Sequence, residues 1–319
     1  MKIRKKPLII TVLSLVLCLS LVIGFTHRMS LTAHAVEITA SVSGMTSGGL
    51  GVSQPQDNVY TFDAYAQIRI MGWYGAWGDY PTPWEDPSDT WWNNAVSTYD
   101  PTSHKWKTEP YMRWQNGENL PHHFLGCWPA DFVDPNTDDL TAVPIKLTGD
   151  YQKDDILVAQ WSGTRPDDNT ARLNFKHLLS RFDVHLHFRD EYTSVSNISV
   201  HTNLANEATV NLFTGEATSQ GGSGGITMQD RPYPDANWDW SGTCITVPQT
   251  SDDLVLTLTF TANGEEKVIT YKHNNALTFK PGERVTLILE VGKMKLELME
   301  TIVTDWDNRN INAGEAEEQ

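Results

Sequence analysis

The chain has 319 residues, 40 of them acidic and 24 basic, and its formal net charge is −16 at pH 7. A surface this acidic repels phosphate groups, which excludes nucleic acids and anionic lipids as favoured partners. The length is greater than that of one typical domain, so we expect two domains.

The N-terminus predicts an export signal. Four basic residues within positions 2–6 precede an apolar run at residues 7–25, and Ala33-His34-Ala35 offers an A-x-A cleavage site. We therefore predict a signal peptide over residues 1–35, cleaved between Ala35 and Val36. An apolar run of this length could also stay in place as an uncleaved membrane anchor. Cleavage leaves 19 basic and 40 acidic side chains, a formal net charge of −21.

Most apolar segments of the mature chain alternate with period two, which predicts β-strands. Residues 62–71 form the first clear run. The run at residues 182–188 has two different faces. Its apolar face comprises Phe182, Val184, Leu186 and Phe188. Its polar face, which we expect to be solvated, comprises Asp183, His185 and His187.

The remaining runs predict hairpins. Asn263-Gly264 separates the runs at 254–260 and 268–271, and an Asn-Gly pair in that position predicts a two-residue turn. Residues 285–291 and 295–303 predict a second antiparallel pair. Many short strands at this spacing favour sandwiches or barrels, so the predicted class is all-β.

Three segments interrupt this pattern. Residues 79–87 contain three prolines and cannot form an inner strand. Residues 215–225 are glycine-rich and predict a flexible excursion. Residues 177–181 have the only helix-like pattern. A strand that ends at Phe175 and another that begins at Phe182 predict a boundary at residue 181, with domains over 36–181 and 182–319.

No catalytic motif is present in the sequence. It contains no nucleophile elbow, zinc-protease, nucleotide-binding or dinucleotide fingerprint. His185 and His187, two residues apart on one strand face, have the spacing of metal ligands. Their polar neighbours favour an ordinary solvated face instead. We therefore predict no enzyme activity, no cofactor and no metal site.

The mature chain retains two cysteines, Cys127 and Cys244. In an oxidising compartment they could form a disulfide. They could equally be two buried thiols that act as small apolar side chains. The sequence leaves both alternatives open.

Tryptophan is concentrated in the predicted first domain, where eight of the twelve lie between residues 73 and 128. Trp73, Trp114 and Trp128 lie on predicted strands and are expected in the core. The irregular stretch between residues 75 and 94 is harder to bury, and exposed aromatic faces there would suit stacking on sugars or a partner's side chains. This possible ligand surface comprises Trp84, Trp91 and Trp92.

Short motifs in the second half resemble those of the fimbrillin family, the minor-fimbrium-like pilins and adhesins. Phe175 and His177 lie in a segment that resembles its F-x-H-L signature. Pro281-Gly282 resembles the family's entry to a late strand, and Trp306 its terminal D-W pair. The matching segments occur in the family's order across residues 60–306.

The resemblance implies two tandem transthyretin-like β-sandwich domains and a non-enzymatic fimbrial or adhesion subunit at the surface of a Gram-negative bacterium. It also implies partners among other fimbrial subunits, through strand donation, or among surface ligands. Three features depart from stalk subunits: no lipobox cysteine, no Arg or Lys between Val36 and Ile68, and a short acidic tail after Trp306. A tip, accessory or stand-alone adhesin therefore fits as well as a stalk component, and the alternative is a glycan-binding surface protein that uses the Trp-rich loop of the first domain, with Trp84, Trp91 and Trp92.

We predict that the exported protein begins at Val36, because the basic, apolar and small-residue regions occur in the order that signal peptidase requires. N-terminal sequencing of the secreted protein tests this prediction. An intact Met1 or a lipid on Cys18 would contradict it.

Overall fold

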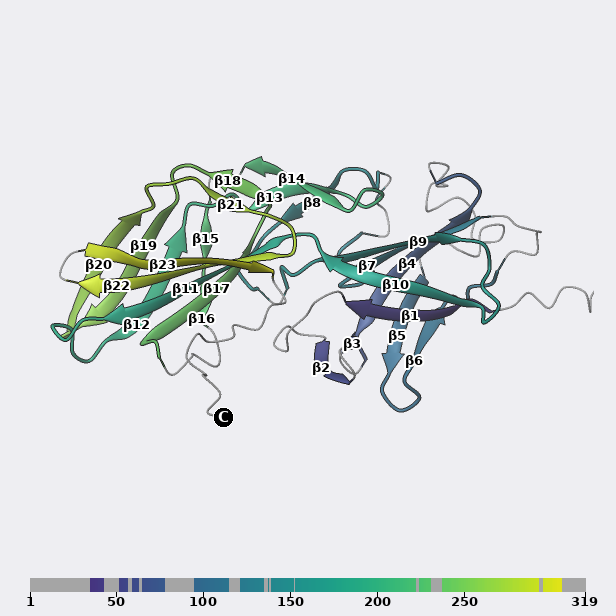
Figure 1. Ribbon diagram of the computed structural model, residues 1–319, viewed down its shortest axis with the longest axis horizontal. Helices are drawn as coiled ribbons and strands as arrows, with labels where there is room; N and C mark the ends of the chain where they lie inside the picture. The colour runs from purple at the N-terminus through teal and green to yellow at the C-terminus, as the bar shows by residue number, and fades with distance from the viewer. Residues whose placement is uncertain are drawn as a thin grey trace, which may run out of the picture.

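The computed structural model describes residues 35–42, 52–56, 59–62, 65–77, 95–114, 121–134, 137, 139–151, 153–221, 224–230, 237–292 and 295–305. Figure 1 shows two lobes side by side, one built mainly from the first half of the chain and the other from the second half. All regular elements among the described residues are strands, which confirms the predicted all-β class.

The first lobe is built around a nine-stranded sheet. In spatial order its strands are β2 (Val52–Gln56), β3 (Val59–Phe62), β1 (Glu37–Val42), β10 (Thr170–His177), β9 (Leu157–Gly163), β7 (His122–Trp128), β4 (Gln67–Tyr74), β5 (Ala95–Asp100) and β6 (Lys105–Glu109). Neighbouring strands are antiparallel except β1 and β10, which run parallel over six residues.

The second lobe contains two facing sheets. One has the order β16 (Gln229–Asp230), β17 (Trp240–Thr246), β11 (Ser180–Phe188), β22 (Glu283–Gly292) and β23 (Lys295–Asp305). The other has the order β15 (Ile226–Thr227), β12 (Ser196–Thr202), β19 (Val255–Ala262) and β20 (Glu265–Lys272).

Two small sheets complete the second lobe. One pairs β18 (Gln249–Ser251) with β21 (Leu277–Phe279). The other has the order β14 (Glu216–Gly221), β13 (Glu207–Asn211) and β8 (Val143–Lys146). β8 comes from the first half of the chain, so the two halves share a sheet.

The predicted hairpins are present. Asn263 and Gly264 have positive φ angles of 55° and 79° and join β19 to β20. Two positive φ angles in a two-residue loop are the mark of a type I′ turn, which matches the twist of the flanking strands. β22 and β23 form the second predicted antiparallel pair.

Three local expectations were wrong. Residues 62–71 do not form one strand, because β3 ends at Phe62 and β4 begins at Gln67. Leu178 and Leu179 form a bend rather than a helical turn between β10 and β11. The glycine-rich stretch contains β14, because its backbone pairs with β13 in antiparallel register. The proline-rich residues 79–87 lie outside the described residues.

Strand β11 confirms one half of its predicted pattern and overturns the other. The side chains of its apolar face, Phe182, Val184, Leu186 and Phe188, are all buried. Asp183 and His185, expected in solvent, are buried as well. Only His187 is exposed as expected.

The polar face of β11 is buried because it is covered and its polar groups have partners. Asp183 lies 2.9 Å from Arg181 Nε and 2.8 Å from Arg284 Nε, so the buried charge is compensated. His185 Nδ1 lies 2.7 Å from Ser241 Oγ, and the Trp238 ring stacks on the imidazole. Period-two alternation cannot tell such a covered polar face from a solvated one.

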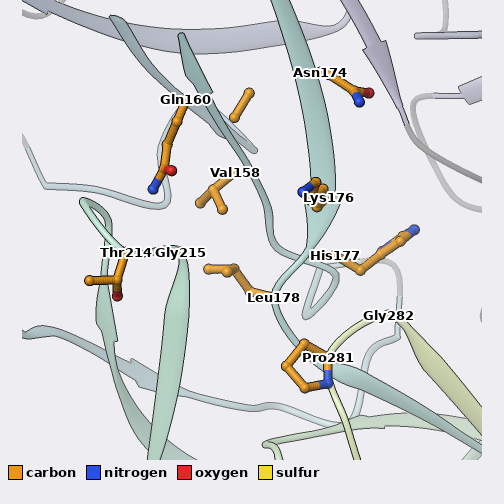
Figure 2. A pocket seen from close by; sticks show the side chains of 11 residues that line it. Val158, Gln160, Asn174, Lys176, His177, Leu178, Thr214, Gly215, Pro281 and Gly282 are labelled. Atoms are coloured by element: carbon orange, nitrogen blue, oxygen red, sulfur yellow. The ribbon is translucent and has the colours of Figure 1, made fainter. Parts of the chain in front are cut away.

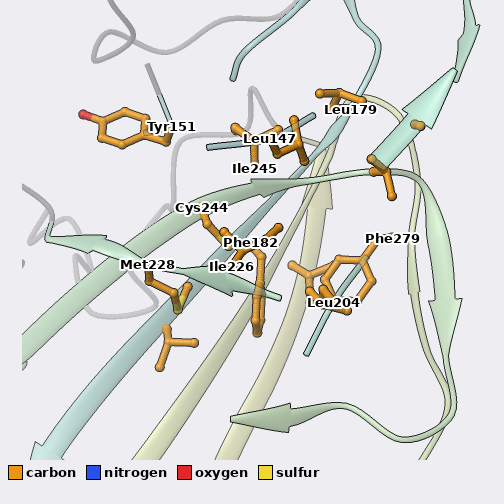
Figure 3. Close-up of a cluster of buried hydrophobic side chains, with 14 of the residues drawn as sticks. Leu147, Tyr151, Leu179, Phe182, Leu204, Ile226, Met228, Cys244, Ile245 and Phe279 are labelled. Atoms are coloured by element: carbon orange, nitrogen blue, oxygen red, sulfur yellow. The ribbon is translucent and has the colours of Figure 1, made fainter. Parts of the chain in front are cut away.

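The larger hydrophobic core fills the second lobe (Figure 3) and continues across the seam onto β4, β7 and β9 of the first lobe. Phe182 is fully buried there and contacts Phe279 edge to face, at a centroid distance of 5.4 Å. Leu147 and Tyr151, which follow β8, belong to the same core. The smaller core lies in the first lobe around Phe62, Trp114 and Phe175.

We expect Phe182→Ala to lower the free energy of unfolding by about 3–5 kcal/mol, because a fully buried ring is replaced by a cavity. His187→Ala, on the same strand, should change it by less than about 0.5 kcal/mol, as exposed positions do. Urea titration of both variants measures the difference. Equal losses would contradict the assignment of faces.

Candidate functional site

A cavity of about 550 Å³ lies where the two lobes meet (Figure 2). Strands β9 and β10 line it from the first lobe. The turn between β13 and β14 and the turn before β22 line it from the second. The polar side chains along it are Gln160, Asn174, Lys176, His177 and Thr214. No Trp, Tyr or Phe side chain is among the described residues that line it.

The residues of the family signature come together at this seam. His177 ends β10, and Pro281 and Gly282 form the turn that precedes β22. Gly282 has a φ of 70°, and its amide donates a 2.9 Å hydrogen bond to the Leu179 carbonyl. A positive φ favours glycine, so the turn can approach the connection between β10 and β11 at low cost.

His177 is buried and has an acidic partner. Its Nδ1 lies 2.7 Å from Asp155 Oδ1, and both side chains are almost fully buried. The partner of this imidazole is therefore a carboxylate from a residue 22 positions earlier in the chain. The pair joins the end of β10 to the residues that lead into β9, which is a structural role. Phe175, two residues earlier, lies fully buried in the first core.

The tip of the β13–β14 hairpin is fastened to the first lobe. Gln160 Nε2, on β9, donates hydrogen bonds of 2.9 and 2.7 Å to the carbonyls of Leu212 and Phe213. The Phe213 ring packs against Trp73 and Trp77 at centroid distances of 5.9 and 6.1 Å. The sequence gives no sign of this contact, because its partners are more than fifty residues apart.

The same aromatic cluster includes His123 of β7. Its Nδ1 lies 2.8 Å from Ser162 Oγ and its Nε2 lies 2.9 Å from the Gly75 carbonyl. Trp73, Trp114 and Trp128 are buried, as predicted for tryptophans on strands. The possible ligand surface formed by Trp84, Trp91 and Trp92 lies outside the described residues and stays a prediction, as does the role of Trp306.

Strand β1 is built into the first core. Val36, Ile38 and Val42 are buried, and the Val36 amide donates a 3.0 Å hydrogen bond to the Met112 carbonyl. Ala35, on the other side of the predicted cleavage site, forms a β-bridge with Arg113. β1 meets β3 at a single register pair but meets β10 along its whole length.

Cys127 and Cys244 are free, buried thiols in this structure. Burial raises the pKa of Cys127 to about 12. Burial also raises the pKa of Cys244, and the negative charge of Asp183 adds to the effect. Of the two alternatives left open by the sequence, the structure has the unpaired thiols.

The two histidines that had the spacing of metal ligands do not converge. His185 binds Ser241, whereas His187 Nδ1 lies 3.0 Å from Asp239 Oδ2. Within the described residues no group of three or more His, Cys, Asp or Glu side chains could hold a metal ion. The same residues include no helix long and apolar enough to cross a membrane.

The sequence profile of the fimbrillin-like family matches residues 56–306, most of the chain. The chain therefore belongs to the fimbrillin-like family. It is accordingly a non-enzymatic fimbrial or adhesion subunit, with a location at the cell surface or outside the cell.

Solved structures share the fold. A candidate cell adhesion protein of Bacteroides uniformis is 18% identical, with a TM-score of 0.58 over 86% of this chain and 98% of that one. One from Bacteroides ovatus is 13% identical, with a TM-score of 0.62 over 88% and 100%. One from Bacteroides fragilis is 12% identical, with a TM-score of 0.51 over 87% and 100%. No curated protein matches the sequence.

We predict that neither thiol of the native mature protein reacts with Ellman's reagent at pH 8, because the thiolate is the reactive form and burial disfavours it. Denaturation without reductant should release both thiols. The absorbance at the end of each reaction gives the number of thiols per molecule that have reacted. Missing thiols after denaturation would instead indicate a disulfide.

Proposed function

We propose that this protein is an exported fimbrial subunit in a tip or accessory position, whose first strand stays in place after export. In this proposal the signal peptide ends at Ala35 and the mature protein is attached to a fimbrium at the outer membrane. Residues 36–181 and 182–319 are its two domains, which β8 holds together by pairing with β13.

The observation that carries the proposal is the protection of β1. Removal of a first strand by a trypsin-like protease would need an accessible Arg or Lys after that strand. The first basic residue after Val36 is Arg69. Arg69 lies within β4, is buried, and donates a 2.6 Å hydrogen bond from Nε to the Ala130 carbonyl. A protease of this specificity therefore has no accessible site between β1 and Lys105 at which to separate β1 from the strands that follow it.

Retention of β1 has a direct consequence for assembly. Strand donation requires an open position in which main-chain hydrogen bonds and side-chain pockets are free. Here β1 occupies the position beside β10 over six residues and fills the core with Ile38 and Val42. A subunit whose own strand occupies this position does not accept the strand of a neighbour there. This behaviour is the one expected of a subunit in a tip or accessory position.

We expect trypsin treatment of the mature protein to leave β1 attached and to produce no SDS-resistant multimers. Mass spectrometry of the digest and gel electrophoresis without boiling measure both outcomes. As a matched control, a trypsin site placed at 46–49, between β1 and β2, should permit release of β1. Multimers of the unmodified protein after digestion would overturn the terminal or accessory role.

A further inference from the structure

Strand β23 is an open edge of the second lobe. It is the outermost strand of its sheet, bonded to β22 on one side, and it runs for 11 residues (Figure 1). A typical strand has about five or six residues. Long free edges are templates for pairing with another chain, and proteins usually shorten or cover them.

The core-facing side of β23 is buried at Leu296 and exposed from Leu298 onward. Its register places Leu298 opposite Leu289 and Val303 opposite Val285, and these two β22 partners are fully buried. Leu298 is nevertheless 42% exposed and Val303 52% exposed. The apolar layer of the core thus continues onto β23, where the described part of the chain leaves Leu298 and Val303 exposed.

A further exposed apolar side chain lies on the same strand. Met299 lies at a β-bulge in β23 and is 54% exposed. The facing sheet ends in the edge strand β20. The two edges bound a cavity of about 670 Å³ lined by residues 270–275 and 295–299. Exposed apolar patches of this kind mark interaction surfaces.

The charges of β23 divide at the bulge. Before it, Glu297 forms ion pairs with Arg189 and Lys295. After it, Glu300 and Asp305 have no ion-pair partner within the part of the chain that the structure describes. Within the described residues, the open half of the edge therefore combines exposed apolar side chains with two carboxylates that have no ion-pair partner.

We propose that β23 from Met299 to Asp305 is a docking edge for an extended segment of another protein, in which apolar side chains alternate with Lys or Arg. Main-chain hydrogen bonds to β23 would supply affinity, and the apolar side chains would cover Leu298 and Val303. Basic side chains on the opposite face would meet Glu300. This surface lies in the second lobe, away from β1, and does not depend on the assembly proposed above.

Charge selects against a second copy of this chain as the occupant. Each mature copy has a formal net charge of −21 and would bring its own Glu300 and Asp305 to the shared edge. Like charges placed opposite each other on paired strands are destabilising. A basic partner instead gains electrostatic steering as well as contact energy.

Two acetylated, amidated peptides test the proposal: one alternating Val with Lys over seven residues, the other alternating Val with Glu. Fluorescence anisotropy with the mature protein should detect the lysine peptide and not the glutamate peptide, with affinity falling as salt rises. Hydrogen exchange should show slower exchange of the backbone amides at 299–305 when the lysine peptide is bound.

Variants then locate the site. Val303→Lys should weaken binding at least about tenfold, because an inward-pointing charge at the edge opposes pairing. Glu300→Gln should weaken it less and reduce the salt dependence. Val268→Lys, the same change at a similarly exposed position on β20, should leave the affinity within about twofold.

Several results would overturn the proposal. These are equal binding of both peptides, unchanged binding by Val303→Lys, or protection elsewhere than residues 299–305. Sedimentation of the protein alone tests the other possible occupant, a second copy of this chain. A dimer that forms in the unmodified protein but not in Val303→Lys would identify that second copy and exclude the basic partner. Matched melting curves of the variants confirm that each is folded, since all three side chains are exposed.

Discussion

The arrangement of the two lobes depends on a connection of only two residues. Leu178 and Leu179 are the whole link between β10 and β11, and both are buried. The Leu178 amide donates to the Ile156 carbonyl in the first lobe, and the Leu179 carbonyl accepts from Gly282 in the second. A buried link with bonded backbone groups on both sides cannot act as a loose tether, because each freed group would carry a desolvation cost.

This constraint explains why residues far apart in the chain meet at the seam. Once β10 runs into β11, the turn before β22 must lie against the link, and the β13–β14 hairpin reaches the first lobe beside it. Gln160 and the Trp73–Trp77 pair hold the hairpin tip by hydrogen bonds and ring contacts. The larger core also continues across the seam, so the lobes are joined at several independent places, which favours a rigid arrangement over two hinged domains.

The two lobes differ in whether a strand position beside the core is occupied or left open. In the first lobe β1 pairs in parallel with β10 and contributes buried side chains, so the chain's own strand fills this position of the sheet. In the second lobe β23 leaves apolar side chains uncovered after its bulge. The five-stranded sheet of the second lobe, with β23 at its edge, therefore offers backbone groups to a partner.

The sequence by itself determined the strands and turns whose signals are local. Asn263-Gly264 specifies its hairpin, and the alternation from Phe182 to Phe188 specifies a core face, because turn geometry and side-chain period act within a few residues. Short sequence motifs also indicated the fimbrillin family, to which the chain belongs. Tertiary structure alone decided that Asp183 and His185 are buried, that Cys127 and Cys244 stay apart, and that Phe213 meets Trp73. Each of these depends on which segments lie opposite one another, and pairing between distant segments leaves no periodic trace in the residues that take part.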